Sequence, residues 1–127
     1  MTIKSSQTLV VEALKEVKTI SPEEALKLNN ENKCNLIDIR ESIELQKLGR
    51  IENSHHVSRG LLEFSIHPES AFVQSRKLDL NKEIVLFCAA GGRSALAVKT
   101  LKEMGFENVS HVDGGFGLMK SSGFKVI

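Results

Sequence analysis

The chain has 127 residues, 41% hydrophobic and 26% charged, in the usual range for one globular domain with its own hydrophobic core. Seventeen basic residues against sixteen acidic ones give a formal net charge of +1, which argues against nucleic acid or a membrane surface as a partner chosen by bulk charge. The apolar stretches are short, and the first ten residues lack the apolar core of a signal peptide. The sequence therefore predicts a cytoplasmic protein.

The first half of the chain predicts helices around one strand. Apolar residues three and four apart predict an amphipathic helix over 5–18. A second helix, from about residue 22 to 28, has Ser21 as its N-cap, Pro22 at its first position and Glu24 completing a capping box. The β-branched run 34–39 predicts a strand, and 41–49 predicts a short helix that stops at Gly49.

The second half predicts strands and helices in alternation. Segments 61–64 and 69–75 fit short helices, and the apolar run 83–88 predicts a strand buried on both faces. A helix over 94–104 follows, then a strand with a glycine turn over 108–115 and a last helical segment in 116–123. This alternation predicts an α/β domain with a largely parallel sheet.

The stretch "CAAGGRS" (88–94) lies between the buried strand and the following helix. In a parallel sheet this is the edge at which ligands bind. Gly91 and Gly92 allow a tight loop whose N–H groups turn toward the Cys88 sulfur. Those groups, the helix N-terminus and Arg93 would together favour a thiolate, the reactive form of cysteine. The alternative is a buried cysteine at a strand end with a plain glycine turn.

With "EMGFENV" (103–109) and "DGGF" (113–116) after it, this loop resembles that of the single-domain rhodanese family. The strand end "NLIDIRE" (35–41) is similar to the family's Leu-Ile-Asp-Val-Arg-Glu segment. The resemblance covers about residues 20–127 and leaves residues 1–19 as an N-terminal helical extension. It implies a three-layer rhodanese-like fold with a central five-stranded parallel sheet flanked by helices.

The resemblance also implies a sulfurtransferase without a cofactor. Cys88 would take a sulfane sulfur from a small donor, such as thiosulfate or a persulfide, and pass it to a thiol, a protein acceptor or cyanide. Arg93 would neutralise anionic charge during transfer. Because the loop interior is uncharged, unlike the basic loop of thiosulfate-using members, the case for thiosulfate as the natural donor is weaker. The substrate would be bound by Ala89, Ala90, Gly91, Gly92, Ser94 and Arg59.

Several of these residues have simpler interpretations. Ser94 could serve mainly as a helix cap, and Arg59 could equally be a solvated surface residue. Asp38 and Arg40, at the end of a strand, suit a structural ion pair better than catalysis. Cys34 suits a small core residue better than a resolving thiol. The four histidines lack metal-ligand spacing, so we expect no metal: His55, His56, His67 and His111.

Two rival functions stay open. Phosphatases and arsenate reductases of related fold also use a cysteine loop that closes on arginine, but their loop has one more residue, which makes room for a tetrahedral oxyanion. A non-catalytic rhodanese-like binding module ranks lower because Cys88 is present.

Overall fold

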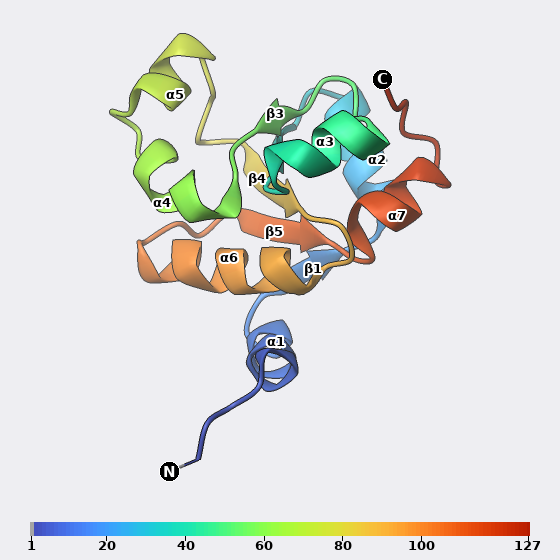
Figure 1. The fold of residues 1–127 in the computed structure, drawn as a ribbon. Helices are drawn as coiled ribbons and strands as arrows, with labels where there is room; N and C mark the ends of the chain where they lie inside the picture. The colour runs from blue at the N-terminus through green and yellow to red at the C-terminus, as the bar shows by residue number, and fades with distance from the viewer. Residues whose placement is uncertain (1) are drawn as a thin grey trace.

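The computed structural model describes residues 2–127 and has a central sheet between two layers of helices (Figure 1). Its five strands run in the order β1-β5-β4-β2-β3, and every pairing between neighbouring strands is parallel. This confirms the expected α/β fold with a five-stranded parallel sheet. The strands are β1 (Lys18–Ile20), β2 (Cys34–Asp38), β3 (His55–His56), β4 (Glu83–Phe87) and β5 (Val109–Val112).

The helices connect the strands and cover both faces of the sheet (Figure 1). Helix α2 begins as predicted, since the Ser21 hydroxyl accepts a hydrogen bond from the Glu24 amide at 3.1 Å. The helices are α1 (Ser6–Leu14), α2 (Pro22–Asn30), α3 (Ser42–Leu48), the 3-10 turn η1 (Arg59–Leu61), α4 (Leu62–Ser65), α5 (Ala71–Ser75), α6 (Gly92–Glu103) and α7 (Gly115–Lys120).

Two apolar clusters fill the space between the sheet and its helices. Successive side chains of a strand point to opposite faces, so Ile84 and Leu86 join the cluster under α4 and α6. Val85 and Phe87 join the cluster under α2 and α7. A central strand that is covered on both sides has to be apolar throughout, which is the pattern that the run 83–88 shows in the sequence.

The main differences from the sequence-based prediction concern the ends of the elements and the edge strands. The N-terminal helix stops at Leu14, so the prediction of a helix over 5–18 was too long. Residues 18–20 form β1, which neither composition nor periodicity indicated, and the two-residue β3 was also missed. Both strands lie at the edges of the sheet and are too short for a recognisable pattern. Helix α6 starts at Gly92, two residues earlier than expected.

Helix α1 lies on the outer side of α6, away from the sheet, and packs against it (Figure 1). The chain just after α1 is tied to α6 through Glu16: its carbonyl accepts from Lys102 Nζ at 2.6 Å, and its carboxylate lies 3.5 Å from Lys99 Nζ. This packing brings α1 beside the N-terminal end of α6.

In the described range 2–127, no helix is both long and apolar enough to cross a bilayer.

Candidate active site

The candidate site begins at Cys88, the first residue after the central strand β4. Its side chain is only 1% exposed, and residues 88–91 turn directly into α6. Gly91 is the N-cap of that helix, with a φ of +112°. That backbone conformation strains any residue with a side chain, so the turn depends on glycine at this position.

The loop surrounds the Cys88 sulfur with hydrogen-bond donors. The amides of Gly91 and Ser94 donate to Sγ at 3.2 and 3.4 Å, and the Ser94 hydroxyl lies 3.5 Å from Sγ. Both amides belong to the N-terminal turn of α6, where the backbone dipoles favour negative charge. The sulfur therefore lies among hydrogen-bond donors at a helix N-terminus. Ser94 is not the helix cap that the sequence suggested, because Gly91 occupies that position.

Helix α7 holds the loop from its other side. The amides of Phe116 and Gly117 donate to the carbonyls of Cys88 and Ala89 at 2.8 and 3.2 Å. A Cβ added to Gly115 would lie 2.4 Å from the Cys88 carbonyl oxygen, so only glycine allows this close approach. This contact explains why a "DGGF" segment accompanies the cysteine loop.

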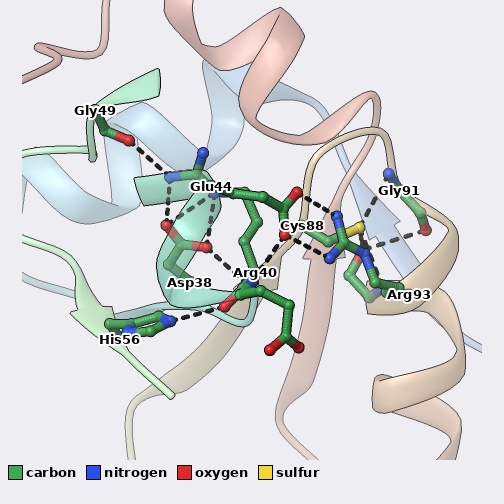
Figure 2. Close-up of polar contacts among 10 residues, drawn as sticks. Asp38, Arg40, Glu44, Gly49, His56, Cys88, Gly91 and Arg93 are labelled. Carbon is green, nitrogen blue, oxygen red and sulfur yellow. Dashed lines mark hydrogen bonds and ion pairs between the residues drawn. The ribbon is translucent and has the colours of Figure 1, made fainter. Parts of the chain in front are cut away.

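Arg93 reaches across the site to helix α3 (Figure 2). Its Nη1 and Nη2 atoms donate to the two carboxylate oxygens of Glu44, both at 2.8 Å. The hydrogen bonds from Arg93 are the main reason that the pKa of Glu44 falls to about 2, and the same pairing raises the pKa of Arg93. No pattern in the sequence indicates this partner, whose carboxylate offsets the positive charge predicted for Arg93 toward a substrate.

A buried ion pair lies beside the site (Figure 2). Arg40 donates to the Asp38 carboxylate through Nε and through Nη2, the latter at 2.7 Å, and both side chains are fully buried. The Arg40 guanidinium also donates to the Gly49 carbonyl and lies 3.9 Å from the centre of the Phe116 ring. The pair thus links the ends of β2 and α3 to α7, and it is the structural ion pair expected from the sequence.

Arg59, which we had grouped with the substrate-binding residues, lies elsewhere. It pairs with Glu63 at 2.7 Å and donates to Thr100 Oγ1 at 3.3 Å, and it does not line the depression beside Cys88.

Cys34 is buried at the start of β2, and burial is the main cause that raises its thiol pKa to about 11. Such a thiol is unreactive at neutral pH, in agreement with a core role.

A depression of about 310 Å³ opens beside the cysteine loop and is lined mainly by apolar atoms. Its far wall comes from α1, through Ser6 and Val10, and Val10 Cγ2 would lie 3.6 Å from a Cβ placed on Gly92. The sequence analysis did not assign these two residues to the site. The depression also brings together five of the predicted site residues with Leu96: Cys88, Ala89, Ala90, Gly92 and Arg93.

His111 is a further residue that sequence reasoning did not place at the site, because we weighed the histidines only as metal ligands. It lies in β5, 1% exposed, and its ring bonds to Ser94 Oγ at 2.8 Å. Residues 109 and 111 of an alternating strand share a face, and the apolar Val109 lies in the cluster under α6. That alternation was a usable signal that His111 faces α6.

The family assignment follows from comparison with known proteins. Residues 21–121 match the family described as the rhodanese-like domain. The match covers most of the chain and includes β2, the cysteine loop and α7. The chain therefore belongs to the rhodanese-like domain family.

Two sets of curated relatives show different contexts for this domain. A thiosulfate sulfurtransferase, GlpE, from Pseudomonas entomophila is 33% identical over 86% of this chain and 90% of its own length. A tRNA uridine(34) hydroxylase from Chlamydia trachomatis is also 33% identical, over 97% of this chain. The matched region is only 39% of that hydroxylase, so the chain spans well under half of such proteins.

Solved structures give the same fold. A Rhodopseudomonas palustris protein of unknown function, described as a possible tyrosine phosphatase, has a TM-score of 0.86 and 33% identity, covering 100% of this chain and 98% of its own. The polysulfide-sulfur transferase homodimer of Wolinella succinogenes has a TM-score of 0.74 and 34% identity, covering 95% of this chain and 85% of its own.

Proposed function

We propose that this chain is a sulfurtransferase that carries a sulfane sulfur as a persulfide on Cys88 and passes it to a thiol or to cyanide. The observation that carries the proposal is the position of the Cys88 sulfur at the N-terminus of α6, where the amides of Gly91 and Ser94 donate to it. Its membership of the rhodanese-like family and its likeness to two sulfurtransferases support the same chemistry.

Transfer would proceed in two exchanges at sulfur. The Cys88 thiolate attacks the outer sulfur of a donor, the bond from that sulfur to the rest of the donor breaks, and its electron pair leaves with the departing anion. An acceptor then attacks the outer sulfur of the persulfide, and Cys88 departs as the thiolate. With cyanide as acceptor the product is thiocyanate. The two amides stabilise negative charge on the sulfur before and after each exchange.

The residues around the loop favour one class of donor. The depression is apolar, and the nearest guanidinium, that of Arg93, is already neutralised by Glu44. A doubly charged donor such as thiosulfate would lose water there without gaining a free cation. A small organic persulfide instead buries its hydrocarbon part against Val10 and Leu96. We therefore propose organic persulfides as the preferred donors, although the relatives carry names for both thiosulfate and polysulfide.

A cysteine-loop phosphatase is the second candidate, because a structural neighbour is described as a possible tyrosine phosphatase. Two features of this chain count against it. Four residues separate Cys88 from Arg93, one fewer than in such phosphatases, which leaves a smaller ring of amides. In addition, both terminal nitrogens of Arg93 are bonded to Glu44 and not directed at an oxyanion.

The hydroxylase relatives extend well beyond the matched region, so we do not extend their activity to this chain.

The test is to incubate the protein with an organic persulfide or with thiosulfate, and to measure the mass of the protein and the thiocyanate formed on adding cyanide. We expect a Cys88 adduct heavier by one sulfur atom, and faster turnover with the persulfide. Cys88→Ser keeps the size of the side chain and should abolish both signals, whereas Cys34→Ala should change neither. If the wild-type protein hydrolyses a small aryl phosphate faster than it forms thiocyanate, the phosphatase assignment replaces this one.

A further inference from the structure

A row of four hydrogen-bonding side chains starts at the Cys88 sulfur and crosses the edge of the sheet. Cys88 Sγ lies 3.5 Å from Ser94 Oγ, and Ser94 Oγ lies 2.8 Å from His111 Nδ1. On the other side of the imidazole, His111 Nε2 lies 2.9 Å from Thr19 Oγ1. Thr19 and His111 are register partners on adjacent parallel strands, so the pairing of β1 with β5 sets this last contact.

The row connects a buried thiol to the protein surface. Cys88, Ser94 and His111 are each no more than 1% exposed, whereas Thr19 is exposed on the edge strand β1. Each inner member has polar partners on both sides, and every contact can run in either direction because hydroxyls and neutral imidazole both donate and accept. Burial lowers the pKa of His111, which keeps the ring neutral and leaves it a single ring proton.

The Gly91 carbonyl, 3.2 Å from Ser94 Oγ, is a further acceptor for the Ser94 proton. Two arrangements of protons instead direct that proton along the row. In the first, the Cys88 thiol donates to Ser94 Oγ, the Ser94 hydroxyl donates to Nδ1 of His111, and Nε2–H donates to Thr19. In the second, every hydrogen bond is reversed: the Ser94 hydroxyl donates to a Cys88 thiolate, Nδ1–H donates to Ser94, and the Thr19 hydroxyl donates to Nε2.

One proton shift along the row converts the first arrangement into the second. The S–H bond breaks, its proton moves to Ser94 Oγ, the Ser94 proton moves to Nδ1, and the Nε2 proton moves to Thr19. The original Thr19 proton passes to solvent water. No charge remains on Ser94, His111 or Thr19, and the net change is loss of one proton from Cys88 to solvent.

We propose that His111 is a positioning residue that couples the ionisation of Cys88 to the direction of the Ser94 hydroxyl. It does so by changing tautomer, with its ring proton either on Nδ1, facing Ser94, or on Nε2, facing Thr19. The coupling lets the hydroxyl add a third donor to the Gly91 and Ser94 amides when the sulfur is anionic. Only the role of this coupling in turnover rests on the proposed function. The ionisation of the Cys88 thiol itself does not depend on sulfur transfer.

Apart from Glu41 and Asp113, the charged groups named here near the row belong to ion pairs. Arg93 of α6 interacts electrostatically with Cys88 and is bonded to Glu44 of α3, and Glu41 also acts on Arg93. Asp113, which follows β5, acts on His111 and opposes the effect of burial. Next to Thr19 in β1, Lys18 pairs with Glu83. The variants below leave all of these groups unchanged.

The test is the rate of Cys88 alkylation by iodoacetamide as a function of pH, in a Cys34→Ala background in which Cys88 is the only thiol. His111→Phe removes both ring nitrogens. We expect the midpoint of its profile to rise by about half to one pH unit, as loss of a hydrogen bond to an anion implies. His111→Asn keeps an amide that can donate to Ser94 and should restore at least half of that shift. Thr19→Val places a methyl group where the hydroxyl was, and should shift the midpoint in the same direction by less.

Ser110→Ala is the matched control, because Ser110 is a buried neighbour in β5 whose hydroxyl has no hydrogen-bond partner in the described part of the chain. Its midpoint should equal that of the parent. An unchanged midpoint in His111→Phe, a failure of His111→Asn to restore it, or a shift in Ser110→Ala as large as in His111→Phe would overturn the proposal. So would a shift in His111→Phe with none in Thr19→Val.

Thermal unfolding checks that each variant is folded. If His111→Phe does not fold, Thr19→Val decides the question alone, since its side chain lies on the surface. Alkylation needs no sulfur donor, so the outcomes separate cleanly. If the variants show the expected shifts of the alkylation midpoint but the wild type forms no thiocyanate, only the sulfurtransferase assignment is rejected. If thiocyanate forms but the midpoints do not shift, only the proposed coupling through His111 is rejected.

Discussion

Glu44 accepts two hydrogen bonds of 2.8 Å from Arg93, so a carboxylate of α3 holds the arginine that closes the cysteine loop. The pair lies at the rim of the depression, with 39% of the Arg93 side chain and 24% of the Glu44 side chain exposed. A free guanidinium at this position would attract anionic donors, whereas the neutralised one does not. In the proposed reaction, Glu44 therefore disfavours anionic donors.

Glu44→Gln should increase turnover with thiosulfate. The amide removes the negative charge and leaves the Arg93 charge available to an arriving anion. An attraction of about 1 kcal/mol, the Coulomb energy of two charges 4 Å apart in water, corresponds to a gain of about threefold to tenfold in kcat/KM. Glu63→Gln, which removes the partner of Arg59 away from the loop, is the control and should leave thiosulfate turnover unchanged. No gain for Glu44→Gln would mean that Arg93 does not meet the donor.

The same ion pair has a predictable pH dependence. Because the pKa of Glu44 is depressed from 4.5 to about 2 in the folded state, its contribution to stability is fully present above pH 4.5 and is lost as pH falls toward 2. The difference in melting temperature between wild type and Glu44→Gln should thus be constant at neutral pH and shrink in acid. A difference that already falls between pH 7 and 5 would contradict the low pKa of Glu44. Exposure and salt keep the effect small.

The cysteine loop and the central strands could be predicted because their determinants are contiguous. Cys88, its two glycines and Arg93 lie within one turn, and the apolar run before them suits only a strand covered on both faces. The buried strand β2 was recognisable for the same reason. The N-cap of α2 was also recognisable, because Ser21 and Glu24 are three residues apart.

The rest of the site depends on residues that are distant in the chain. Glu44 meets Arg93 across 49 positions, and His111 reaches Thr19 across 92. Val10 enters the site only because α1 packs against α6. Such contacts depend on how the helices and strands pack together, so the sequence pattern of a single segment does not predict them. The short edge strands β1 and β3 were missed on the same grounds, since pairing with a neighbour is what defines them.

Gly115→Ala should damage the site through the backbone. The added Cβ would lie 2.4 Å from the Cys88 carbonyl oxygen and 2.9 Å from backbone atoms of Ala89, and the residue has a φ of +55°. We expect a loss of stability of roughly 1–3 kcal/mol, from strained backbone and a displaced loop. Thiocyanate formation should fall more than the folded fraction does, because the amides that face the sulfur move with the loop.

Gly60→Ala is the control for this substitution. Nothing lies within 4 Å of a Cβ at that position, and its φ is not in the left-handed region. Its stability and activity, measured by urea unfolding and cyanide assay, should stay close to those of the wild type. Full activity in Gly115→Ala would show that the contact between α7 and the loop is dispensable.

Val10→Lys should change which donor the protein prefers. Val10 lies on the wall of the depression that faces the cysteine loop, and it comes from an element outside the residues matched by the family. A lysine there replaces an apolar contact with a cation at the rim. Thiosulfate would gain about threefold to tenfold in kcat/KM by Coulomb attraction, and an organic persulfide with a hydrocarbon substituent would lose a similar factor through lost apolar contact.

Val11→Lys is the matched control, since it adds the same charge one residue further along α1, where the side chain is 54% exposed and does not line the depression. It should raise thiosulfate turnover much less and leave persulfide turnover unchanged. The measurement is kcat/KM for both donors in the three proteins, at two salt concentrations, because a charge effect shrinks as salt rises while an apolar contact does not. Equal donor preference in Val10→Lys and Val11→Lys would show that α1 acts through net charge alone. A wild type that already prefers thiosulfate would reject the proposed donor class, while the persulfide chemistry of Cys88 could still stand.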